Sequence, residues 1–163
     1  MSQRHPVYTT CIRGSPEQIF DLIADMPHYD VWLPGSAAFG GTTQVSPYPV
    51  QLGTRYLDAG PAGERPGFVT EFDRPRRIAF HHTMRLSKGL LAADIDVHVR
   101  YTLEAAGAST EVVRLLELTI AMRGLAALAE PLVVQAFHKE NRRILAALRR
   151  YVEAHPENTA PAT

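Results

Sequence analysis

The chain has 163 residues, of which 45% are hydrophobic and 21% are charged. These values are typical of one soluble domain that is large enough to bury an apolar core without metals or disulfides. The 17 basic and 17 acidic side chains cancel, so the chain lacks the positive field typical of nucleic-acid-binding proteins, and we expect no nucleic acid partner.

The cysteine content and the amino terminus predict a cytoplasmic protein. Cys11 is the only cysteine, which excludes an internal disulfide and a cysteine-based zinc site and fits a reducing compartment. Residues 1–6 are polar and lack the pattern of a secretory signal. The most apolar stretch, residues 115–137, is interrupted by Glu117 and Glu130, so we expect no membrane span.

The first expected elements are a strand and two short helices. Residues 7–12 are rich in β-branched and aromatic side chains, which favours a strand. Ser15 and Gln18 have the spacing of a capping box, which predicts a helix that begins directly after Ser15. Residues 28–34 contain the only tryptophan, Trp32, and are expected to form a second short helix or a turn.

Between residues 39 and 120, short runs of alternating apolar and polar residues predict consecutive antiparallel strands. Residues 67–84 can be paired as a hairpin around a turn at 73–77. This register places His82 on the apolar face among phenylalanines. It pairs Phe72 with Ile78, Thr70 with Phe80, and Phe68 with His82.

A second hairpin is expected within residues 94–120. One face of its first strand is apolar and consists of Ile95, Val97, Val99, Tyr101 and Leu103. The favoured register of the return strand adds Arg114 to this face, beside Tyr101. The opposite parity is nearly as apolar, so the sequence leaves open whether Arg114 faces inward or outward.

The other face of this strand carries polar side chains. Asp94, Asp96 and His98 alternate there, and carboxylates and imidazoles are proper metal ligands. His81 belongs to the same outer face in the first hairpin. Because this face is opposite the apolar one, a solvated surface explains these side chains better, and we expect no metal site.

A long helix is expected after Met122, because apolar residues then follow a helical stripe as far as Val152. About thirty residues at 1.5 Å each would span roughly 45 Å, enough to cross a sheet of this size. Pro131 is expected to bend the helix near residues 127–131. Residues 1–155 are predicted to form one domain, and residues 156–163 a disordered tail.

The expected order of elements defines an α+β fold in which one helix covers a curved antiparallel sheet of about seven strands. Together with Tyr29, four segments carry a resemblance to a known family: SPEQIFDLIAD (15–25), WLPG (32–35), GTRY (53–56) and EFDRPRRI (71–78). The chain resembles the START-like, helix-grip (SRPBCC) superfamily in its polyketide cyclase/dehydrase and lipid-transport branch. The resemblance implies a sheet wrapped around the terminal helix with an apolar cavity between them, which in this superfamily holds lipids, sterols or polyketides.

A cavity is also expected on physical grounds, because a bent sheet and a long helix do not stay in contact along their whole length. Small residues at 126, 127 and 129 leave room at the start of the helix, and an apolar pocket with a few polar groups is the usual small-molecule site. The residues predicted to bind a ligand there are Trp32, Tyr56, Phe68, Phe80, His82, Tyr101, Arg114, Leu128 and Leu132.

The candidate catalytic residue is His82, because an imidazole with a pKa of about 6.5 can act as an acid or a base. The structural alternative is a packed histidine that bonds to a neighbour. An inward Arg114 would need either a protein carboxylate or a ligand oxygen as its partner. Tyr56 and Tyr101 would donate hydrogen bonds to a ligand carbonyl or serve as plain core residues.

Two hypotheses share this cavity. The first is a binding protein for a hydrophobic small molecule, lipid or polyketide-like, and the second is a polyketide cyclase/dehydratase-type enzyme that uses His82 as acid or base. Two or more titratable groups at one ligand position would favour the enzyme, and a wholly apolar lining would favour carriage. A weaker third hypothesis, a protein-interaction module, requires a filled cavity and an exposed apolar patch. No cofactor is expected, and a homodimer stays open.

Overall fold

The computed structural model describes residues 1–61, 63–88 and 91–157. The strands within these ranges are β1 (Ser2–Arg4), β2 (Val7–Arg13), β3 (Gly41–Ser46), β4 (Arg55–Gly60), β5 (Gly63–Asp73), β6 (Arg77–Lys88), β7 (Leu91–Ala106) and β8 (Ser109–Met122). The helical elements are α1 (Pro16–Ala24), the 3-10 helix η1 (Met26–Val31), the 3-10 helix η2 (Gly124–Ala129) and α2 (Glu130–Ala154).

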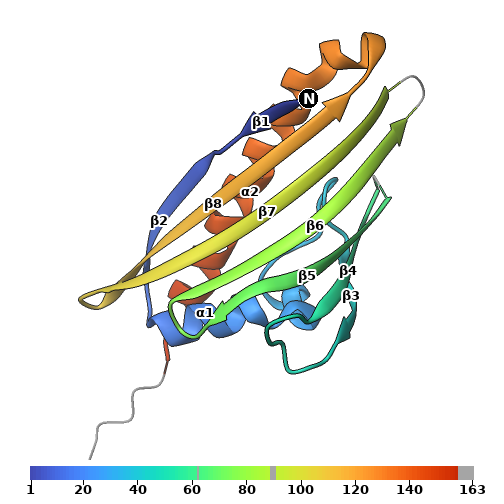
Figure 1. The fold of residues 1–163 in the computed structure, drawn as a ribbon. Helices are drawn as coiled ribbons and strands as arrows, with labels where there is room; N and C mark the ends of the chain where they lie inside the picture. The colour runs from blue at the N-terminus through green and yellow to red at the C-terminus, as the bar shows by residue number, and fades with distance from the viewer. Residues whose placement is uncertain (62, 89–90, 158–163) are drawn as a thin grey trace, which may run out of the picture.

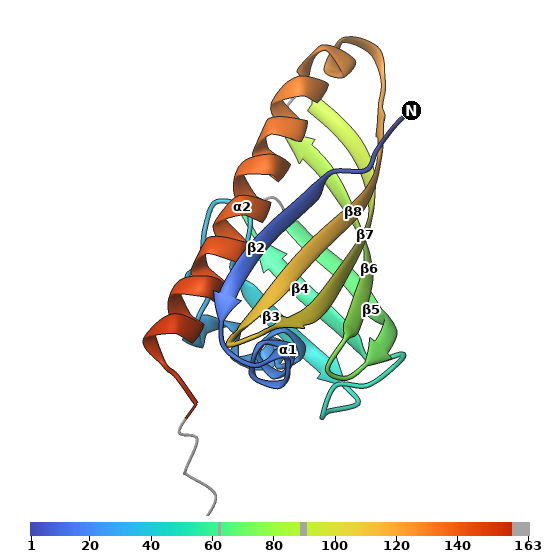
Figure 2. The same cartoon turned by 90° about the vertical axis from the view of Figure 1, so that its left-hand side faces the viewer.

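The strands form one curved antiparallel sheet in the order β1-β8-β7-β6-β5-β4-β3, and β2 also pairs with β8. Figure 1 shows the long strands β6, β7 and β8 crossing α2, and the view in Figure 2 shows α2 lying along the concave side of the sheet. The predicted α+β helix-grip architecture is therefore confirmed. The edge strand is divided into β1 and β2 at His5-Pro6, because a proline has no N–H to donate to the ladder.

The two short helices follow β2 as the sequence predicts. The Ser15 hydroxyl accepts a hydrogen bond from the Gln18 backbone N–H at 3.1 Å and caps α1. Ile19, Phe20 and Ile23 of α1 are fully buried, and Phe20 packs edge-on against Phe72 of β5 with ring centroids 5.2 Å apart. These contacts close one end of the space between the sheet and α2.

The β7–β8 hairpin has the predicted register and the predicted faces. Tyr101 pairs directly with Arg114, and the alternating residues from Ile95 to Leu103 are buried. Arg114 is buried among them, which settles its orientation: it faces inward.

The β5–β6 hairpin departs from the predicted register beyond its turn. Phe72 pairs with Ile78 as expected, but the register shifts between Val69 and Glu71, so that Val69 pairs with Phe80 and Phe68 with His81. An extra residue in one strand of a pair reverses the faces of everything beyond it. Val69 is consequently buried, whereas Phe68 is 43% exposed on the outer face, and the predicted inward position of Phe68 is wrong.

The terminal helix begins later than the sequence predicts. Residues Gly124–Ala129 form η2, and α2 starts at Glu130 with Pro131 in its first turn. A proline in the first turn lacks an N–H that would have no helical partner anyway, so it starts the helix and does not bend it. The 25 residues of α2 span roughly 38 Å.

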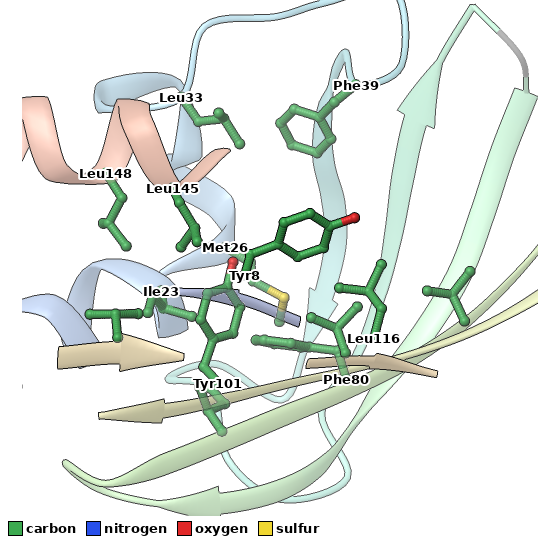
Figure 3. Packing of buried hydrophobic residues seen from close by; sticks show 14 of the residues in the cluster. Tyr8, Ile23, Met26, Leu33, Phe39, Phe80, Tyr101, Leu116, Leu145 and Leu148 are labelled. Atoms are coloured by element: carbon green, nitrogen blue, oxygen red, sulfur yellow. The ribbon is translucent and has the colours of Figure 1, made fainter. Parts of the chain in front are cut away.

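The two halves of α2 differ in burial. Leu145, Leu148 and Val152 in the second half are buried in the core, whereas Leu132 at the start is 68% exposed. Figure 3 shows Leu145 and Leu148 of α2 above the sheet residues Phe80, Tyr101 and Leu116.

Within the ranges described here, no helix combines the length and apolar character that a membrane crossing requires. Of the predicted tail, residues 158–163 lie outside the described part of the chain.

Candidate functional site

A pocket of about 400 Å³ lies between the first half of α2 and the concave face of the sheet. Its walls are the segment 26–39, strands β4 to β8 and the α2 residues from Leu132 to Ile144. The volume falls within the range of small-molecule sites. Space is therefore left between helix and sheet, whereas the interaction-module hypothesis requires them to be in full contact.

Aromatic side chains form much of the pocket wall. Phe80 packs edge-on against Tyr56 on one side and against Tyr101 on the other, with ring centroids 6.0 and 6.4 Å apart. Trp32, which follows η1, packs edge-on against Tyr29 at 5.1 Å. Edge-to-face pairs of this kind hold each ring in one orientation, so the apolar wall has a fixed shape.

The Tyr56 ring lies across a strand that has no side chain at the point of contact. Gly67 of β5 sits beneath it, and a Cβ atom at this position would be 2.5 Å from Tyr56 Cζ and 2.9 Å from the His81 carbonyl oxygen. Both distances are shorter than atoms can approach. Gly67 therefore allows Tyr56 to lie flat at the pocket wall, and any larger residue would displace it.

Arg114 is the buried cation of the pocket. Its Nε donates to Asn141 Oδ1 at 2.6 Å, its Nη1 donates to the Tyr101 hydroxyl, and its guanidinium carbon lies 4.7 Å from the centre of the Tyr101 ring. Asn141 in turn donates to the Phe137 carbonyl at 2.7 Å. All these partners are neutral, and Arg114 has no ion pair within the described ranges. The carboxyl groups of the pocket, Asp58 and Glu140, are not within ion-pair distance of it.

A second guanidinium, that of Arg65, belongs to the same pocket. Arg65 of β5 pairs across the sheet with Asp58 of β4. Its Nε and Nη2 atoms are buried and have no hydrogen-bond partner among the residues described. Burial raises the pKa of Asp58, while a hydrogen bond from Thr42 and the positive charges of Arg65 and Arg114 oppose the rise. Two arginines thus face a carboxyl group whose ionisation is disfavoured by burial.

The imidazole of His82 lies at the pocket wall in a strongly perturbed environment. Burial lowers its pKa to about 3, and the charges of Arg65 and Arg114 contribute in the same direction. His82 Nδ1 is 3.5 Å from the Tyr56 hydroxyl, and burial keeps that hydroxyl protonated by raising the pKa of Tyr56. Near neutral pH, His82 is therefore a neutral imidazole that offers one donor and one acceptor.

The structure places most of the predicted ligand-binding residues at this pocket. Those at its wall are Trp32, Tyr56, Phe80, His82, Tyr101, Arg114 and Leu132. Phe68 lies on the opposite face of the sheet. Leu128 is 80% exposed in η2 and does not line the pocket. It was predicted from a helical pattern, but α2 begins only at Glu130.

Four polar residues of the pocket, Asp58, Arg65, Glu140 and Asn141, escaped the sequence analysis. Asp58 could have been found from its parity, since it lies two residues after the inward Tyr56 on one strand. Asn141 interrupts the apolar stripe of the helix at a spacing of four from Phe137, which is also visible in the sequence. Arg65 had no such signal, because its segment lacks alternation.

Comparison with known proteins assigns the chain to a family. Residues 5–153 match the family described as polyketide cyclase / dehydrase and lipid transport. The chain belongs to this family. No curated protein sequence matches the chain, so the comparison narrows function only to the family's broad role in binding hydrophobic ligands or in polyketide cyclase-type chemistry.

Several solved structures have the same fold as this chain. Protein MLL2253 from Mesorhizobium loti is 12% identical with a TM-score of 0.69, over 93% of this chain and 98% of that one. A START superfamily protein from Mycobacterium smegmatis is 15% identical with a TM-score of 0.64, over 92% and 97%. The di-domain ARO/CYC protein BexL of the BE-7585A biosynthetic pathway is 17% identical with a TM-score of 0.65, over 92% of this chain and 46% of that one. At these identities the likeness shows the fold alone.

Proposed function

We propose that the pocket binds a hydrophobic small molecule that carries an acidic group, a lipid-like or polyketide-like acid. The observation that carries this proposal is the pair of arginines, Arg65 and Arg114, which line the pocket without an ion pair to any described carboxylate. Of the two carboxyl groups in the same lining, burial disfavours ionisation of Asp58, and Glu140 pairs with Arg143. A buried charge without a counter-charge is costly. An anionic ligand would supply that counter-charge.

The other polar atoms of the pocket support a ligand that accepts hydrogen bonds. The indole Nε1 of Trp32 and two nitrogens of Arg65 are buried, and none of them has a hydrogen-bond partner in the described part of the chain. The Tyr56 hydroxyl and a neutral His82 add further groups that can donate. A carboxylate, phenolate or β-diketone oxygen accepts from such donors, while the aromatic wall surrounds the apolar body.

A pair of fluorescent probes tests the charge preference. Anilinonaphthalene sulfonate and N-phenyl-1-naphthylamine share an aromatic skeleton, but only the first is anionic. We expect the wild-type protein to bind the anionic probe more tightly, and Arg65→Met to weaken it by at least roughly tenfold, about 1.4 kcal/mol, with little change for the neutral probe. Arg114→Met should act in the same direction.

The matched control is Arg76→Met, which removes an exposed arginine at the tip of the β5–β6 hairpin. It should leave both affinities unchanged. Equal binding of the two probes to the wild type, with no effect of Arg65→Met on either, would show that the pocket does not select acids. Near-ultraviolet circular dichroism of each variant verifies that the aromatic packing is retained.

A second candidate function is a polyketide cyclase/dehydratase-type enzyme, which is favoured by the number of titratable groups at one place. His82, Tyr56 and Asp58 line the same pocket as both arginines. In such a reaction His82 would take a proton from a carbon between two carbonyls, and the guanidinium of Arg114 would stabilise the enolate. With a pKa of about 3, His82 is a weak base until negative charge develops beside it.

This second function predicts turnover of a poly-β-ketone substrate, followed by mass spectrometry of the products. His82→Gln should abolish product formation, leave the fold intact and weaken binding of the anionic probe much less than Arg65→Met does. Product formation at the wild-type rate in His82→Gln would exclude the proposed base.

A further inference from the structure

A group of titratable side chains lies on the outer face of the sheet, away from the pocket. His81 of β6 pairs directly with His98 of β7, and Asp96 precedes His98 by two residues on the same strand. Directly paired residues and residues two apart share one face of an antiparallel sheet. The topology therefore brings two imidazoles and one carboxylate together.

The three side chains lie close together. His81 Nε2 lies 2.8 Å from Asp96 Oδ2, and His98 Nε2 lies 3.2 Å from Asp96 Oδ1. The two imidazole rings are parallel, with centroids 4.0 Å apart and planes 4° from one another. All three potential ligand atoms lie within 4.8 Å of each other. A tetrahedral zinc ion with bonds of about 2.0–2.1 Å separates its ligand atoms by about 3.3 Å. To coordinate one ion, both imidazoles would have to rotate out of their parallel stack so that their nitrogens point to the same position.

The neighbouring charges leave this group available. Arg85 pairs with Asp94 at 2.7 Å and Arg100 pairs with Glu71 at 3.1 Å. Across the ranges that the structure covers, Asp96 forms ion pairs only with the two histidines. The carboxylate thus has no lysine or arginine to compete with a metal ion.

Neighbouring side chains pack around the three residues. Phe68, which the β5 register shift turns outward, packs edge-on against the His81 ring with centroids 5.3 Å apart. On the other side, Glu117 of β8 pairs directly with His98 and adds a second carboxylate to the same face. Packing that orients a histidine ring favours metal binding because less freedom is lost on coordination.

We propose that His81, Asp96 and His98 bind a divalent transition-metal ion of the zinc type. Two imidazole nitrogens and one carboxylate oxygen are a ligand set that zinc accepts, with a fourth position left for water or for Glu117. The ion would join strands β6 and β7 on the outer face. This site differs from the pocket, because His81 and His82 point to opposite faces of the same strand.

Titration of metal-free protein with Zn²⁺ in a calorimeter tests the site. We expect one ion per chain, and we expect His98→Gln and Asp96→Asn each to weaken binding by at least tenfold. His98 is partly exposed, so its replacement should leave the fold unchanged. Bound Zn²⁺ should also raise the unfolding temperature of the wild type but not that of His98→Gln.

The matched control is His28→Gln. His28 pairs with Asp25 at 3.0 Å, and this pair lacks the second histidine that the proposed site has. Replacing His28 should therefore not change the affinity for zinc. The proposal is overturned if His98→Gln binds Zn²⁺ as tightly as the wild type, or if His28→Gln weakens binding as much as His98→Gln does.

Discussion

The two halves of α2 face the same sheet but have different surroundings. The second half contains the buried residues Leu145, Leu148 and Val152, and the helix packs against β2 and α1. The first half, from Leu132 to Ile144, lines a pocket of about 400 Å³. One continuous helix thus contributes core at one end and a pocket wall at the other, which separates the residues that stabilise the fold from those that meet a ligand.

The polar residues follow the same division. Arg114 and Asn141 lie where the core ends and the pocket begins, and their hydrogen bond at 2.6 Å joins sheet to helix there. On the side of these residues toward the start of α2, the pocket lies between the sheet and the helix. The contrast teaches that a cavity in this fold needs no insertion or extra element, only a helix that packs closely at one end.

The largest expected effect comes from replacing a leucine in each half of the helix. Leu148→Ala removes a fully buried side chain and should lower the free energy of unfolding by about 2–5 kcal/mol. Leu132→Ala removes a side chain that is mostly exposed and should lower it by less than about 1 kcal/mol. Urea unfolding of both variants measures the difference, and equal losses would contradict the division of the helix.

An intermediate effect is expected from the protonation of His82, which makes the free energy of unfolding depend on pH. Its pKa in the folded protein is about 3, below the value of about 6.5 in an unfolded chain. Between these values only the unfolded chain takes up the proton, so the stability that His82 contributes falls as the pH decreases through this window. Between about pH 6.5 and pH 5 the loss should reach up to about 2 kcal/mol.

Urea unfolding at about pH 7.5 and pH 5 checks this prediction. His82→Gln should lose less stability than the wild type between the two conditions. His5→Gln, which removes an exposed histidine, should behave as the wild type does. If His82→Gln and the wild type respond equally, His82 is not held neutral in the pocket.

The smallest effect is expected at Leu128, which a helical stripe placed at the ligand but which the structure leaves exposed in η2. Leu128→Ser should change the free energy of unfolding by no more than about 0.5 kcal/mol and should not alter binding of the anionic naphthalene probe. Fluorescence titration and urea unfolding measure both. A marked loss of probe affinity would extend the pocket to η2.

The two hairpins show what the sequence could and could not predict. In β7–β8 the alternation is unbroken, so both faces and the pairing of Tyr101 with Arg114 followed from periodicity. In β5–β6 the predicted register is correct at Phe72 and wrong at Phe68. A single extra residue reverses the two faces of the strand, and the amino-acid composition does not indicate where it occurs. Pairing rules act locally, whereas a bulge is selected by the curvature of the whole sheet.

The pocket shows the same limit in another form. His82, Tyr56 and Arg114 were predicted because each lies within an alternating strand, whereas the contribution of Arg65 depends on strand pairing with Asp58. The low pKa of His82 was also beyond the sequence, since it arises from burial and from two arginines on other strands.

The sheet that separates the pocket from the outer surface is one strand thick, and His81 and His82 are consecutive residues on it. A peptide unit links their Cα atoms at about 3.8 Å, so a guest molecule that shifts the strand at His82 also shifts His81. A spectroscopic label on the exterior histidines would therefore act as a gauge of whether the interior is filled, without entering it.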